Sequence, residues 1–87
     1  MKRSKEIEAV LKGARLMERL KSWDKIHDWL EIENLSHRKA NAWVYANNNG
    51  INAPEARMDK MTAKAREICD RNGWTLDTSN LYMVAEE

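Results

Sequence analysis

The sequence predicts a single, mainly α-helical domain over residues 1–87, with a compact four-helix fold and a short C-terminal β-hairpin. Three observations support this prediction. Apolar residues recur at intervals of three and four in four separate stretches, which is the periodicity of amphipathic helices. Residues typical of helix ends separate these stretches. The last stretch instead has two apolar runs around a turn-forming segment. A chain of this length has room for one hydrophobic core.

The first helix is expected over residues 4–21, with Ser4 as its N-cap. Gly13 inside it costs about 1 kcal/mol relative to alanine, which indicates a close backbone approach at that position. Its apolar side covers an arc of about 200°, wider than the stripe of an ordinary surface helix. Such a helix is either central in the domain or shared in a homodimer. The apolar side holds Ile7, Ala9, Val10, Leu11, Ala14, Leu16, Met17 and Leu20.

A second helix over residues 24–33 and a third over residues 37–48 are expected, with a break between them. Asn34 tolerates the left-handed conformation of a tight turn, and Ser36 is a good N-cap for the third helix. The inward residues of the second helix are Trp23, Ile26, Trp29 and Leu30, and those of the third are Ala40, Trp43 and Val44. Gly50 and the asparagines before it provide a C-cap signal.

The fourth helix is expected over residues 54–72, because Pro54 suits the first turn of a helix and Gly73 suits its end. Its predicted inner face holds Met58, Met61, Ala65, Ile68 and Cys69. A β-hairpin is expected over residues 74–84, with strands at 74–76 and 81–84 around the turn-forming residues 77–80. A short terminal helix capped by Ser79 is the alternative for this segment.

Residues 25–46 resemble a helix-turn-helix DNA-binding unit. Leu35 matches the apolar turn position of this unit, and Ser36 matches the N-cap of its second helix. The apolar positions of the second helix are matched by Ala40, Trp43 and Val44. Asn34 stands in place of the turn glycine, while Leu30 and Glu33 depart from the pattern of the first helix. The resemblance implies a small DNA-binding regulator of transcription that binds duplex DNA through the second helix of the unit. The residues expected to contact DNA are His37, Arg38, Lys39, Asn41 and Tyr45.

The charge distribution bears on this expectation. The net charge is only +1, whereas affinity for DNA comes largely from contacts of Lys and Arg with phosphates. The second helix has an acidic outer face made by Asp24, Asp28 and Glu31. A basic strip is predicted on the fourth helix. Its two interpretations are a second phosphate-binding surface and an ordinary solvent-exposed side of the helix. The strip consists of Arg57, Lys60, Lys64 and Arg71.

A protein partner is the alternative to DNA. Trp23, Trp74 and Tyr82 lie at element ends or in the hairpin, where their rings are expected to be partly exposed. Exposed aromatic rings are typical of protein-binding surfaces. The small size and near-neutral charge fit an adaptor or inhibitor of the kind that phages and mobile elements direct against host proteins.

No catalytic, cofactor or metal site is expected. His27 and His37 lie ten residues apart without a third ligand, and Cys69 falls on the apolar face of its helix. No glycine-rich phosphate loop is present. No apolar run approaches the length of a membrane span, so we expect a cytoplasmic, non-enzymatic protein.

Overall fold

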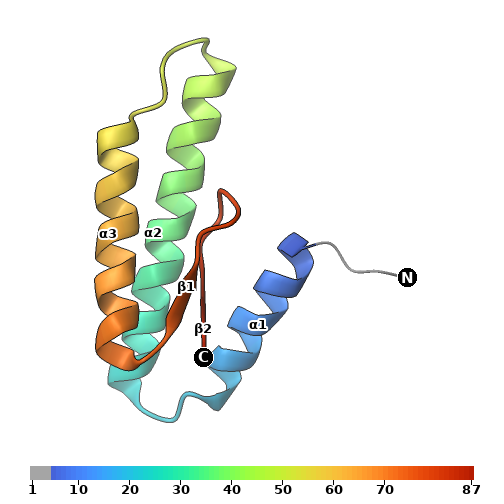
Figure 1. Cartoon of the computed structure of the whole chain (residues 1–87), viewed down its shortest axis with the longest axis vertical. Helices are drawn as coiled ribbons and strands as arrows, with labels where there is room; N and C mark the ends of the chain where they lie inside the picture. The colour runs from blue at the N-terminus through green and yellow to red at the C-terminus, as the bar shows by residue number, and fades with distance from the viewer. Residues whose placement is uncertain (1–4) are drawn as a thin grey trace.

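The computed structural model describes residues 5–87, with side chains from residue 7 onward (Figure 1). It contains α1 (Lys5–Arg19), α2 (Trp23–Asn48), α3 (Glu55–Asn72), β1 (Thr75–Asp77) and β2 (Val84–Glu86). The prediction of a mainly helical chain with a short C-terminal hairpin is confirmed. The prediction of four helices is wrong, because there are three in this range. The expected cap at Ser4 lies outside the described residues.

The difference arises in α2, which runs without interruption through residues 33–36. The expected turn is absent because nothing in that segment requires one. Asn34 accepts helical dihedrals, and no residue other than glycine has a positive φ in the described chain. Leu35 and Ser36 are both buried in the helical conformation. Tertiary packing of this kind outweighs helix-propensity differences of a few tenths of a kcal/mol per residue.

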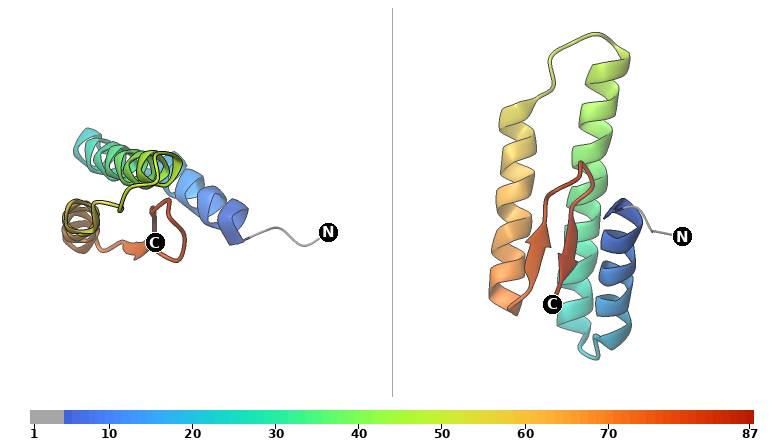
Figure 2. Two further views of the ribbon diagram at one scale, coloured as in Figure 1. Left: turned by 90° about the horizontal axis from the view of Figure 1, so that it is seen from above. Right: turned by 45° about the vertical axis from the view of Figure 1, so that its right-hand side comes forward.

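The helices and the hairpin form a flat molecule, 43 × 35 × 16 Å in extent. α2 and α3 run antiparallel side by side, and the hairpin lies between α3 and α1 (Figures 1 and 2). α1 therefore packs chiefly on β2. The core lies where α2, α3 and the hairpin meet. It includes Leu16, Ile32, Leu35, Met61, Ala65, Ile68, Cys69, Trp74, Leu76, Met83 and Ala85.

The contact between α1 and β2 depends on Gly13. A Cβ atom built at this position would lie 2.6 Å from Cγ1 of Val84. The expected close backbone approach at Gly13 is therefore confirmed. Two ion pairs flank it, Lys12 with Glu86 and Arg19 with Glu87, with N–O distances of 3.5 and 2.8 Å. These pairs join the basic N-terminal helix to the acidic C-terminal strand.

The hairpin is antiparallel, with Leu76 opposite Ala85. Its first strand agrees with prediction to within one residue, whereas the second begins at Val84 rather than Leu81. The connecting segment is stabilised by Asp77, whose Oδ1 accepts hydrogen bonds from the backbone N–H and hydroxyl of Ser79. Met83, the last residue before β2, donates its backbone N–H to Oγ of Ser36 at 2.7 Å. Ser36 is thus a buried anchor for the hairpin and not a helix cap.

Candidate functional site

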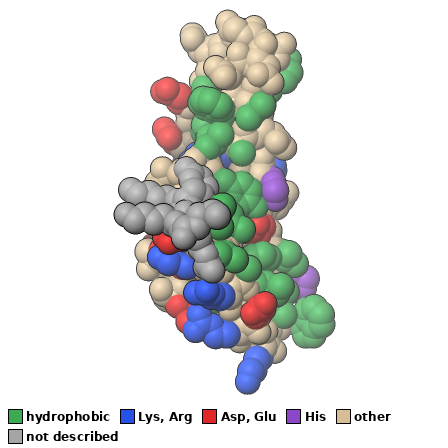
Figure 3. Space-filling view, turned by 90° about the vertical axis from the view of Figure 1, so that its right-hand side faces the viewer, with side chains coloured by type: hydrophobic (Ala, Val, Ile, Leu, Met, Phe, Trp, Pro, Cys, Tyr) green, Lys and Arg blue, Asp and Glu red, His purple; other side chains and the backbone are tan. Residues whose placement is uncertain are grey.

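An apolar groove runs between α1, α2 and the hairpin, and we call it the α1 groove. It has a volume of about 290 Å³. Its walls are formed by Val10, Gly13, Ala14 and Met17 of α1, Trp29 and Glu33 of α2, and Tyr82 and Val84 of the hairpin. Figure 3 views this side of the molecule and shows hydrophobic side chains gathered in a band beside α1. The groove is therefore part of a larger apolar surface.

The apolar residues of α1 divide into two sets. Ala9 and Leu16 are buried, while Val10 and Met17 remain 53% and 40% exposed at the groove. On α2, Trp23 is 74% exposed and Leu30 is 50% exposed. Contiguous apolar exposure on a small domain commonly marks an interaction site. The wide apolar arc of α1 was the sequence signal for this surface, although it did not identify the groove residues of α2 and the hairpin.

Two polar side chains that line the α1 groove, Glu33 and Tyr82, form a hydrogen-bonded trio with His37. The Tyr82 hydroxyl donates to Oε2 of Glu33 and lies 2.9 Å from Nε2 of His37. The His37 ring also meets the Tyr82 ring edge-to-face, with centroids 4.9 Å apart. Burial, and then the Glu33 carboxylate, raise the pKa of Tyr82, so the phenol stays protonated and acts as a donor. His37, predicted as a DNA-contacting residue, thus helps to hold the hairpin on α2.

Trp29, one of the residues that line the α1 groove, has a buried donor without a partner in the described part of the chain. Its side chain packs against the core, and its Nε1 atom is buried. No acceptor among residues 7–87 reaches this N–H group. Buried donors usually have partners, and one left without a partner costs stability. A bound group that placed an acceptor here would remove that cost.

A second concavity, which we call the tip cleft, lies between α2 and α3 near the loop that joins them. Its volume is about 510 Å³. Three of the predicted DNA-contacting residues, Arg38, Asn41 and Tyr45, line it together with Arg57 of the predicted basic strip. The other lining residues are Ala42, Ala46, Ile51, Asn52, Pro54 and Met61. Lys39 is not among them and lines a different pocket with Trp43.

The basic strip on α3 does not act as one positive surface. Lys64 pairs with Glu31 at 3.3 Å, and Arg71 pairs with Asp28 at 2.7 Å. The Arg71 guanidinium and then the Asn72 amide lower the pKa of Asp28 below its usual value. The predicted acidic outer face of α2 is therefore partly an inter-helix surface. Two of the four strip residues, Arg57 and Lys60, have no carboxylate within 4.0 Å among the described side chains.

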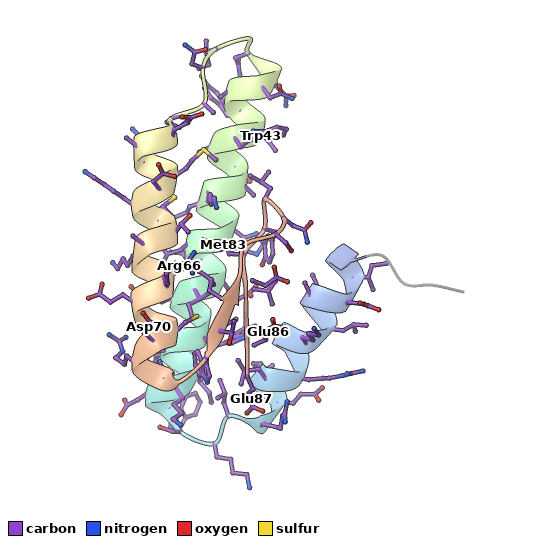
Figure 4. The ribbon with its side chains drawn as sticks, viewed as in Figure 1. Trp43, Arg66, Asp70, Met83, Glu86 and Glu87 are labelled. Carbon is purple, nitrogen blue, oxygen red and sulfur yellow. The ribbon has the colours of Figure 1, made fainter. Side chains whose placement is uncertain are left out.

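The tryptophans only partly follow expectation. Trp23 is exposed, as expected for a ring at an element end, so its expected place on the inward side of the helix is wrong. Trp74, also expected to be partly exposed, is buried in the core and offers no ring to a partner. Trp43 was expected inside and is instead substantially exposed, because it lies near the upper end of α2, beyond the turn of the hairpin (Figure 4). Leu30 and Val44, also predicted to face inward, are likewise exposed.

The remaining chemistry-bearing side chains are isolated. Burial raises the pKa of the Cys69 thiol to about 11, so the reactive thiolate is disfavoured. Across residues 5–87, no three His, Cys, Asp or Glu side chains are grouped as metal ligands. No helix in this range is long and apolar enough to span a bilayer. Comparison with protein-family models, curated proteins and solved structures finds no match.

Proposed function

We propose that this chain is a non-enzymatic binding protein that associates through the α1 groove. The observation that supports the proposal is the exposure of Val10 and Met17 beside an apolar groove that their own domain leaves unfilled. Burial of apolar surface stabilises association by roughly 25 cal/mol per Å² before the costs of binding. The groove, bounded by two helices, suits an amphipathic helix as its occupant.

We further propose that the occupant is α1 of a second copy. In a two-fold symmetric interface, the same residues serve as surface and as ligand on both subunits. α1 meets this requirement, because Val10, Ala14 and Met17 form one wall of the groove and also an exposed apolar face. Its basic side is directed to Glu86 and Glu87 and stays outside the contact. The small side chain of Ala14 allows two helices to approach closely.

Size-exclusion chromatography with light scattering tests this proposal. We expect a mass of twice the 10.2 kDa of the chain. Val10→Asp should give a monomer, because a carboxylate in an apolar interface loses its hydration without gaining a partner. Val44→Asp is the matched control, since Val44 is similarly exposed but lies outside the groove. A wild-type monomer at high protein concentration, or equal effects of the two variants on the mass, would refute the dimer.

DNA binding is the second candidate function. It is favoured by the placement of Arg38, Asn41 and Tyr45 on one exposed side of α2, since Arg and Asn are suited to guanine and adenine edges. The ion pairs of Lys64 and Arg71 count against it, because they leave little free positive charge for phosphates. Fluorescence anisotropy with duplex DNA across a salt series tests it. Absence of binding at low salt, or binding unaffected by Arg38→Ala and Asn41→Ala, would reject it.

A further inference from the structure

Two ion pairs join α2 and α3. Asp28 faces Arg71, and Glu31 faces Lys64. The helices are antiparallel, so residues late in α2 lie beside residues early in α3, near the loop that joins them (Figure 1). In that region each helix contributes one arginine to the tip cleft, Arg38 from α2 and Arg57 from α3.

This like-charged position has no compensating acid. The residues that line the tip cleft include no Asp or Glu. The nearby acids of the first turns of α3, Glu55 and Asp59, line a different pocket with Lys39. Among the described side chains, neither Arg38 nor Arg57 has a carboxylate within 4.0 Å. Two cations that line one cleft repel each other, and an anion bound between them removes the repulsion.

We propose that the tip cleft binds a small organic phosphate. Arg38 and Arg57 provide planar donor groups that match phosphate oxygens in paired hydrogen bonds. Tyr45 and the amides of Asn41 and Asn52 add neutral polar contacts around the same cleft. The walls of Ala42, Ala46, Ile51 and Met61 are apolar and suit the organic body of the ligand. The volume of about 510 Å³ is in the range of small-molecule sites.

Phenyl phosphate is a suitable probe, with inorganic phosphate and sodium chloride at equal ionic strength for comparison. A ligand that binds only the folded state stabilises it by RT ln(1 + L/Kd), where L is the free ligand concentration, so at equal concentration the tighter ligand raises the melting temperature more. We expect phenyl phosphate to raise the melting temperature more than inorganic phosphate, and inorganic phosphate more than chloride. Isothermal titration should show binding of phenyl phosphate weakened by about tenfold in Arg38→Gln and in Arg57→Gln.

Arg66→Gln is the matched control. Arg66, labelled on α3 in Figure 4, lies nine residues from Arg57, which is two and a half turns, so it is on the opposite side of the helix. It does not line the cleft. This variant has the same change of charge and should bind phenyl phosphate like the wild type. Without ligand and at low salt, Arg57→Gln should also melt higher than Arg66→Gln, because it removes the repulsion with Arg38.

Three outcomes would overturn the proposal. The first is a rise in melting temperature with phenyl phosphate that is no larger than the rise with sodium chloride. The second is an equal loss of binding in Arg57→Gln and Arg66→Gln, which would mean that general charge is responsible. The third is much tighter binding of a short DNA duplex that also depends on Arg38 and Arg57, which would assign these residues to DNA. The α1 groove is not involved, so the dimer can fail while this site stands.

Discussion

Ser36 is the residue whose role differs most from what its position in the sequence indicates. Its hydroxyl is completely buried in the middle of α2 and accepts the Met83 backbone N–H. That hydrogen bond satisfies a buried main-chain donor at the point where the chain enters β2. A serine flanked by Leu35 and His37 is equally consistent with a helix cap, and only the tertiary fold distinguishes the two roles.

Ser36→Ala should lower the free energy of unfolding by about 1–3 kcal/mol, because the Met83 N–H would stay buried without an acceptor. Urea denaturation followed by circular dichroism measures the change. Ser22→Ala is the control. Ser22 occupies the N-cap position of α2 but makes no side-chain capping bond, so its loss should have little effect. A Ser36→Ala variant as stable as the Ser22→Ala variant would contradict the anchoring role.

At the scale of elements, the packing of α1 on β2 depends on the absence of a side chain at Gly13. Gly13→Ala should increase intrinsic helix propensity by about 1 kcal/mol, yet we expect net destabilisation. The new methyl group would meet Cγ1 of Val84, a buried β-branched side chain that cannot rotate away without cost. Overpacking of this kind typically costs about 1–3 kcal/mol.

A double-mutant cycle separates the two effects. Val84→Ala alone should destabilise the protein by leaving a cavity, but it should make Gly13→Ala neutral or stabilising in the same background. Thermal or urea unfolding of the four proteins gives the coupling energy. Additive effects of the two substitutions would show that Gly13 and Val84 do not determine the helix–strand distance.

The elements were predictable where local signals act alone. Asn48 ends α2 and Gly73 follows α3 as expected, because a glycine with positive φ lies close after each helix. The break at residues 33–36 was not correctly predicted, since Asn34 and Ser36 permit a turn but do not impose one. β2 begins directly after Met83, whose backbone N–H is bonded to Ser36, a residue distant in sequence that no local signal connects to the hairpin.

The candidate sites were predictable only in part, for a related reason. Helical periodicity placed Arg38, Asn41 and Tyr45 on one side of a helix, and all three line the tip cleft, whereas His37 and Lys39 of the same predicted set do not. It could not show that Arg57 joins them across the tip cleft. Helical periodicity also could not show that Arg71 forms an ion pair with Asp28, because pairing between helices depends on how they are aligned.

For the molecule as a whole, a buried thiol and a half-buried phenol predict sensitivity to alkali. Burial raises the pKa of Cys69 from 9.0 to about 11, and burial with Glu33 raises that of Tyr82. The unfolded chain therefore loses these protons at lower pH than the folded protein. The free energy of unfolding should be unaffected below about pH 9 and should fall as the pH rises through 9 to 11.

Urea denaturation at a series of pH values from 7 upward measures this decline. Cys69→Ala removes the first of the two groups, so the onset should move to higher pH even if the variant is less stable overall. If the decline in stability began at the same pH in Cys69→Ala, or if the wild type were equally stable up to pH 11, the decline could not be attributed to Cys69 and Tyr82.

The packing of α1 on β2 has a consequence for how the protein is made. α1 is synthesised before every other described element, and the strand that it packs on is synthesised after all of them. At about 5–20 residues per second, several seconds pass between the two on the ribosome. During that interval α2 and α3 can pair, but the apolar side of α1 has no strand to cover it. The nascent chain is therefore expected to bind a chaperone at α1 until residues 84–86 emerge.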